Sequence, residues 1–271
     1  MDQVQLTTFQ AVVDTGSFEA AARQLHVTPS AVSQRIKALE RAVGQVLVRR
    51  AKPCVATPAG QALVRFAGQV ALLEREALDQ ARDGTRVTIV VNADSLLTWF
   101  LPALAAVPGP AYELHTDDQD YTADLLRSGT AMAAVTAEHV AVQGCRLEPL
   151  GAMRYLAVGR SATDPMIVYN RKDRLQHRFL ASAGLSFDAP THYVPAAAAF
   201  VEAIRLGMGW GMVPEGLARA GLAAGHYVEI LPGKYLDVPL YWQYWRIESA
   251  VLSAITAAVR AAAATALITG R

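Results

Sequence analysis

Residues 18–40 read FEAAARQLHVTPSAVSQRIKALE, and their apolar spacing predicts two short helices joined by a tight turn. Ser17 can cap the first helix, and Thr28 followed by Pro29 predicts the start of the second. The inward-facing residues of the two helices are Phe18, Ala21, Ala22 and Leu25, then Val32, Ile36, Leu39 and Val43, with Gly44 as the stop. With an apolar helix over residues 6–13 before it, this pattern is typical of a helix-turn-helix.

The opposite face of the second helix carries side chains suited to DNA. Ser30, Ser33, Gln34 and Lys37 recur there at helical spacing. Hydroxyl and amide groups reach base edges in the major groove, and basic groups neutralise phosphates. Two short β-prone pieces follow at 46–48 and 55–57, joined by the basic sequence RRAKP, which is the outline of a wing. A three-helix bundle with a solvated polar face is the alternative, and the wing argues against it.

This region resembles the winged helix of LysR-type transcriptional regulators, and the sequence TPAG at 57–60 extends the match. The resemblance implies an all-α winged helix-turn-helix over residues 1–57 that binds a double-stranded DNA operator with dyad symmetry. It also implies RNA polymerase as a partner. The residues expected to contact DNA are Ser17, Pro29, Ser30, Ser33, Gln34, Arg35, Lys37, Arg49, Arg50 and Lys52.

A long linker helix is predicted over residues 58–84, because Thr57 can cap it and Pro58 can begin it. Its apolar residues alternate steps of four and three, which is the repeat of a coiled coil. The expected dimer seam is Leu63, Phe66, Val70, Leu73 and Ala77. A dimer suits two recognition helices that must meet half-sites about 34–36 Å apart. The resemblance implies a homodimer and often a tetramer, whereas packing of this helix on its own domain is the alternative.

From residue 86 onward, short β-rich runs alternate with helical runs, and glycine or proline marks the joints. This βαβ pattern predicts parallel sheets covered by helices, with ligands at the carboxyl ends of the strands. The family resemblance implies a two-lobed α/β effector domain over residues 85–271, similar to periplasmic binding proteins. The expected lobe I is about 85–153 plus 246–271, and lobe II is about 154–245. Strand-like pieces at 154–158 and 240–245 are expected to cross between the lobes.

Within that family, the sequences NADS at 92–95, DQD at 118–120 and NRKD at 170–173 are most similar to the arginine- and lysine-responsive branch. This implies a sensor of lysine or arginine that controls a transport or export gene. A helix start at Ser95 suits a carboxylate, and aspartates at strand ends suit a cation. The residues expected to bind the effector are Asn92, Asp94, Ser95, Asp118, Asp120, Thr136, Pro195 and Trp210. Thr136 as a strand-end cap, Trp210 as a core residue and the aspartates as turn residues are the alternatives.

Composition sets further limits. The 271 residues are 52% hydrophobic and 18% charged, which suits folded domains. Net charge is +1, but seven bases and one acid lie within residues 23–52, so positive charge gathers in the predicted DNA-binding unit. The two cysteines do not have metal-ligand spacing, and no metal or cofactor is expected. No signal-peptide pattern and no catalytic motif is found, so we expect a cytoplasmic protein without membrane contact that is not an enzyme.

Other functions stay open at this point. A redox switch through Cys54 and Cys145, and an architectural or replication-modulating DNA-binding role without an effector, are two of them. A different effector is a third, because alanines fill 196–199 after Pro195, where relatives tend to carry hydroxyl residues. The segment between Gly159 and Met166 and the joint near Gly84 are also shorter than is usual in the family, which implies a trimmed lobe or omitted residues.

Overall fold

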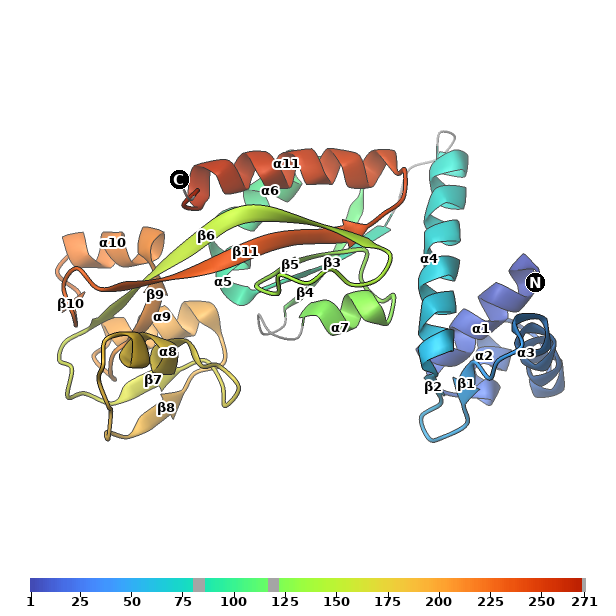
Figure 1. Ribbon diagram of the computed structural model, residues 1–271, viewed down its shortest axis with the longest axis horizontal. Coiled ribbons are helices and arrows are strands. Elements are labelled where there is room, and N and C mark those ends of the chain that lie inside the picture. Colours follow the sequence, from blue (N-terminus) through green and yellow to red (C-terminus); the bar gives the residue numbers. More distant parts are fainter. Residues whose placement is uncertain (80–85, 117–121, 270–271) are drawn as a thin grey trace.

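The long helix α4 (Pro58–Asp79) stands between a small N-terminal helical unit and a larger α/β unit (Figure 1). This computed structural model describes residues 1–79, 86–116 and 122–269. No helix among these residues is long and apolar enough to cross a membrane. The order of the winged helix-turn-helix, the linker helix and the α/β region is the predicted one.

The N-terminal unit is built from three capped helices. They are α1 (Gln3–Thr15), α2 (Phe18–Gln24) and α3 (Pro29–Val43). The predicted caps are confirmed, because the hydroxyls of Ser17 and Thr28 accept hydrogen bonds from the third amide downstream at 3.3 and 3.1 Å. The core holds the predicted inner residues of α3 except Val43, which lies exposed in the last turn before Gly44.

The wing is an antiparallel pair of two-residue strands, β1 (Val48–Arg49) and β2 (Val55–Ala56). Its base is tied to α3, because the Glu40 carboxylate accepts hydrogen bonds from the amides of Leu47 and Val48 at 2.9 and 3.3 Å. Its far side packs on the turn between α1 and α2. A Cβ atom at Gly16 would lie 2.7 Å from the Cβ of Pro53, so this close approach requires glycine.

Helix α4 contacts both units of the chain along one face. Val64 belongs to the N-terminal core, and Leu72 belongs to the core of the α/β unit. A Cβ atom at Gly68 would lie 2.9 Å from Cη2 of Trp245, so the indole packs directly against the helix backbone. The Arg65 guanidinium donates to the carbonyl of Arg127 at 2.6 Å. The predicted alternative of packing within the chain is therefore correct for this face.

The α/β unit contains one seven-stranded mixed sheet in the order β10-β6-β11-β5-β3-β4, with β9 also paired to β6. Its strands are β3 (Arg86–Val91), β4 (Ala111–Thr116), β5 (Ala133–Thr136), β6 (Cys145–Gly159), β9 (Gly211–Pro214), β10 (Val228–Glu229) and β11 (Tyr235–Trp245). Parallel pairing is confirmed for β3 with β4 and β5. The predicted parallel pairing does not hold for the whole sheet, because the long strands β6 and β11 pair antiparallel.

Strands β6 and β11 are the crossing strands that the sequence predicts, and both are longer than predicted. Their register shifts between Leu240 and Tyr241, on the way between the two ends of the α/β unit. One end carries β7 (Met166–Val168), β8 (Thr191–Tyr193), α8 (Leu175–Ser182), α9 (Ala197–Arg205) and α10 (Glu215–Ala223) (Figure 1). The other carries α5 (Ala93–Ser95), the π-helical turn η1 (Leu96–Phe100), α6 (Leu101–Ala105), α7 (Thr122–Arg127) and α11 (Ala250–Ala266).

Candidate functional site

The exposed face of α3 presents the predicted base-reading residues to solvent. Pro29, Ser30, Gln34 and Lys37 are exposed, and Ser33 is half-buried among them. Arg35 behaves differently, because its guanidinium donates to the hydroxyl of Thr8 on α1 at 3.3 Å. The helix thus offers hydroxyl, amide and ammonium groups, which are the groups that read base edges and hold phosphates.

The wing adds three exposed bases, Arg49, Arg50 and Lys52. The Arg50 guanidinium lies 4.8 Å from the centre of the Phe18 ring, a cation–π contact that joins the wing to α2. Ser17 is a structural cap in this structure, since its hydroxyl is used by the amide of Ala20 and by the Glu19 carboxylate.

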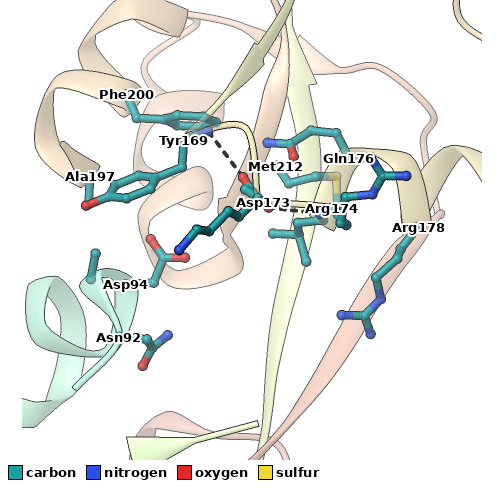
Figure 2. Close-up of a pocket in the computed structure, with 13 residues that line it drawn as sticks. Asn92, Asp94, Tyr169, Asp173, Arg174, Gln176, Arg178, Ala197, Phe200 and Met212 are labelled. Carbon is teal, nitrogen blue, oxygen red and sulfur yellow. Dashed lines mark hydrogen bonds between the residues drawn. The ribbon is translucent and has the colours of Figure 1, made fainter. Parts of the chain in front are cut away.

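A cleft opens at the carboxyl end of β3, where the first lobe meets the second (Figure 2). Lobe I contributes the turn that begins α5, and lobe II contributes the segment around α8 and the start of α9. The lining residues are Asn92, Ala93, Asp94, Tyr169, Lys172, Asp173, Arg174, Leu175, Gln176, Arg178, Ala197, Phe200 and Met212. The cleft has the concave shape and the mixed apolar and polar lining of a small-molecule site.

Asp94 is the ionisable residue that lobe I contributes to the lining of the cleft. The hydroxyl of Tyr155, fully buried on β6, donates to its carboxylate at 2.7 Å. The pKa of Asp94 is raised to about 6, mainly by burial and to a smaller extent by the nearby charge of Asp173, whereas the hydrogen bond from Tyr155 opposes the rise. At neutral pH this carboxylate is mainly ionised in a poorly hydrated place, so it favours a positive ligand group.

Two neighbouring polar side chains have no partner within the described part of the chain. The amide of Asn92 and the hydroxyl of Ser95 are buried, and neither makes a hydrogen bond there. No side chain caps the start of α5 either, although the helix continues through η1 and α6. Because buried polar groups are normally paired, these groups mark where a ligand would bind.

The lobe II wall is organised by Asp173. Its carboxylate accepts hydrogen bonds from the amides of Tyr169 and Leu175 at 3.2 and 2.9 Å, and so holds the turn that leads into α8. Sequence reasoning missed Tyr155, Asp173 and Gln176 as site residues. The runs NRKD at 170–173 and RYL at 154–156 are similar to the arginine- and lysine-responsive branch and include Asp173 and Tyr155, but neither run identified its residue as part of the cleft.

Asn92 and Asp94 therefore lie in the cleft as predicted, and Ser95 adjoins it. Asp118 and Asp120 lie outside the described residues. Thr136 ends β5 and accepts from the amide of Glu138 at 3.0 Å, which makes it a strand-end cap. Pro195 is exposed and does not line the cleft.

Trp210 is a core residue and does not line the cleft, so its predicted place in the effector site is wrong and the alternative of a core residue is correct. Only 1% of it is exposed, and its ring packs edge-on against Phe187 with centroids 5.4 Å apart. Its backbone extends the lobe II strands, because its amide donates to Pro165 and its carbonyl accepts from Ile167. A Cβ atom at Gly209 would lie 2.1 Å from the carbonyl oxygen of Pro165, so the glycine allows this segment to approach the lobe II strands closely.

Comparison with known proteins defines the class. Residues 4–61 match the bacterial regulatory helix-turn-helix protein model of the lysR family, and residues 80–266 match the LysR substrate binding domain. The chain belongs to the LysR family of transcription regulators, as the sequence resemblance predicts. Regulators of this class bind DNA and small-molecule effectors and are oligomeric.

Particular relatives are similar over nearly the whole chain. The HTH-type transcriptional regulator LysG of Mycobacterium tuberculosis is 48% identical over 97% of this chain and 94% of its own length. The lysine export transcriptional regulatory protein LysG of Corynebacterium glutamicum is 40% identical over 96% and 97%. The full-length structure of that LysG with bound effector Arg is 39% identical, with a TM-score of 0.85 over 99% of this chain and all of that one. The two-lobed fold and the absence of an enzyme function are thereby confirmed.

Proposed function

We propose that this chain is a transcription regulator that binds arginine or lysine in the cleft and controls a gene for transport or export of that amino acid. The observation that carries the proposal is the pair of carboxylates on opposite walls, Asp94 from lobe I and Asp173 from lobe II (Figure 2). A basic amino acid has two positive groups, whereas a neutral one has only its ammonium. The bound Arg and the lysine-export name of the relatives support this choice.

The amino-acid head fits lobe I. The unpartnered Asn92 amide, the Ser95 hydroxyl and the start of α5 suit a carboxylate, and Asp94 suits the adjacent ammonium. Phe200 and Met212 in the same cleft suit the methylene groups of a long side chain. Lys172, Arg174 and Arg178 also line the cleft, but they are exposed, and water screens their charge.

The proposed DNA interface combines α3 with the wing. Pro29, Ser30, Ser33 and Gln34 read base edges, while Lys37 and the three wing bases hold phosphates. Arg35 is better placed to brace α3 against α1 than to reach a base. Ser17 contributes by fixing the start of α2.

The dimer seam is the exposed stripe of α4. Phe66 and Leu73 are 41% and 40% exposed, and Val70 is half-buried beside them, so the stripe offers apolar area to a second copy. Leu63 packs on the N-terminal core, so it contributes less to the seam. The side chain of Ala77 lies outside the described ones.

Effector binding can reach α4 through the crossing strands. Tyr155 on β6 holds Asp94, and its partner in the register with β11 is Leu236. The same strand β11 ends at Trp245, which packs against Gly68 of α4. A change in lobe arrangement therefore moves the helix that carries the DNA-binding unit.

The test is calorimetric titration of the full chain with arginine, lysine and leucine. We expect arginine or lysine to bind at least tenfold more tightly than leucine, and Asp94→Asn to weaken every ligand by about tenfold or more. Asp124→Asn is the matched control, because Asp124 is an exposed acid of the same lobe paired with Arg127. Equal binding of all three amino acids, or of none, would rule the proposal out.

A further inference from the structure

Gln176 is a buried residue on the lobe II wall of the cleft. Within the described residues, only one of the two polar groups of its side-chain amide makes a hydrogen bond. Gln176 lies in the first turn of α8 and is 1% exposed. Its Nε2 donates to the carbonyl of Ile167 at 3.0 Å. Its Oε1 is buried and accepts no hydrogen bond from any residue that the structure describes.

The orientation of this amide is fixed by chemistry. A backbone carbonyl can only accept, so the NH₂ group of Gln176 must face Ile167 and the oxygen must face elsewhere. Gln176 lines the cleft, across from Asn92 and Asp94 in Figure 2. A buried acceptor without a donor costs about 1–3 kcal/mol, so such a group is expected to meet a donor when the protein is in its working state.

Tyr169, Lys172, Arg174 and Arg178 line the same cleft and carry donors, but none of them donates to Oε1 of Gln176. The other neighbours have no donor to offer. Both carboxylate oxygens of Asp173 accept from backbone amides of the turn before α8, and carboxylates do not donate. Phe200 and Met212 are apolar. The wall thus combines the negative charge of Asp173 with a directional neutral acceptor.

We propose that Oε1 of Gln176 accepts a hydrogen bond from the nitrogen at the side-chain end of the effector, so that Gln176 selects amino acids with a terminal N–H donor. This inference rests on the proposed function, in which lobe I holds the amino-acid head. The effector then bridges the lobes, with its head at Asp94 and its side-chain nitrogen at Gln176. Asp173 favours effectors whose side chain is positively charged, whereas Gln176 favours effectors whose side chain ends in an N–H donor, charged or neutral.

The test titrates the full chain and Gln176→Leu with arginine, lysine, citrulline and norleucine. Citrulline keeps N–H donors at its end without the charge, and norleucine has neither. We expect Gln176→Leu to lower affinity for arginine, lysine and citrulline by about 10- to 100-fold and to leave norleucine unchanged. An equal loss for norleucine would make Gln176 merely structural, and unchanged binding of arginine and lysine would also overturn the inference.

Two further variants keep the result decisive. If Gln176→Leu does not fold, Gln176→Glu places a charged acceptor at the same point, and the ratio of arginine to citrulline affinity should rise about tenfold or more; an unchanged ratio overturns the inference. Gln243→Leu is the matched control. Gln243 is fully buried on β11 away from the cleft, its Oε1 accepts from the amide of Val142, and its Nε2 has no partner among the described residues.

The proposed function and the role of Gln176 can be disproved separately. If the wild-type chain binds neither arginine nor lysine, the proposed function fails. If the wild-type chain binds them and Gln176→Leu binds them equally well, only the role of Gln176 fails. The Gln243→Leu control should shift the melting temperature without changing the order of ligand affinities.

Discussion

Asp94 shows how one residue links burial to ligand choice. Its carboxylate is held by Tyr155 and has a pKa raised to about 6, mainly by burial. An acid that the fold keeps poorly hydrated is costly without a ligand and favourable with a cationic one. Effector binding is therefore coupled to proton release at this site.

Effector affinity is predicted to fall as the pH falls below about 6. Protonation removes the charge that binds the ligand ammonium, so the apparent affinity for arginine should decrease by up to about tenfold per pH unit there and be flat above pH 7. Asp94→Asn should bind weakly throughout and lose this pH dependence. Titration calorimetry between pH 5 and 8 measures both curves, and a wild-type affinity that is constant across pH 6 would contradict the role of Asp94.

Substitutions of single residues in the DNA interface should distinguish the residues that determine sequence specificity from those that contribute affinity for any DNA. Gln34→Ala should cost about 1–3 kcal/mol of operator affinity and relax sequence preference, because it removes a contact to a base edge. Lys52→Ala should weaken all DNA sequences alike and reduce the salt slope by about one, because it removes a phosphate contact. Anisotropy titrations at several salt concentrations distinguish them, and an unchanged slope for Lys52→Ala would exclude its phosphate role.

Site residues differ in how far the sequence reveals them. Ser17 and Thr28 are recognisable as caps because a cap acts on an amide three residues away. Asp94 is recognisable because it follows a buried strand. Tyr155 is not, because it meets Asp94 across 61 residues of chain and depends on which strands become neighbours. The sequence left Trp210 undecided between cleft and core, because an aromatic residue between glycines gives no periodicity that shows which side of the sheet it faces.

Among the elements, α4 has two faces with different tasks. One packs within the chain, through Gly68 against Trp245, and the other exposes Phe66 and Leu73. Its 3.5-residue repeat predicts an apolar face. It does not predict the contact at Gly68, because a glycine has no side chain and does not contribute to an apolar pattern. The helices were predictable from their caps and periodicity. The full lengths of β6 and β11 were not, because both cross two lobes with different surroundings.

The exposed stripe of α4 is predicted to hold the dimer together. Phe66→Glu combined with Leu73→Glu places two like charges from each copy in the seam, so the chain should become monomeric and lose most of its operator affinity. Light scattering measures the mass in solution. Leu206→Glu is the control, because Leu206 is 57% exposed on lobe II, outside the stripe. A double variant with the wild-type mass would place the dimer contact elsewhere.

The contact between Gly68 and Trp245 is predicted to transmit the effect of arginine binding in the cleft to the DNA-binding unit. Gly68→Val would force the indole away from α4, at a cost of about 1–3 kcal/mol in the free energy of unfolding. Arginine affinity should stay within twofold, while the change in operator binding caused by arginine should be lost. Gly216→Ala is the control, because no atom lies within 4 Å of a Cβ atom there. A Gly68→Val chain that still responds to arginine would show that the signal takes another route.

In the whole molecule, the order of the units connects the effector cleft physically to the DNA-binding unit. The DNA-binding unit, α4 and the lobe that carries Asp94 are in continuous contact, and β6 and β11 join that lobe to the second (Figure 1). Closing the cleft on a ligand can therefore change how two DNA-binding units are held relative to one another. The family and the two-lobed architecture were predictable from the sequence. The mixed sheet was not, because antiparallel pairing of distant strands leaves no local pattern.

The most direct measurement is a nuclease footprint of the full chain on the DNA beside its own gene, with and without arginine or lysine. We expect two protected half-sites related by dyad symmetry, centred one helical turn or a multiple of it apart. We also expect arginine or lysine to change the protected pattern and Asp94→Asn to abolish this change. Uniform protection of any DNA, with a pattern that neither amino acid alters, would contradict the proposed function.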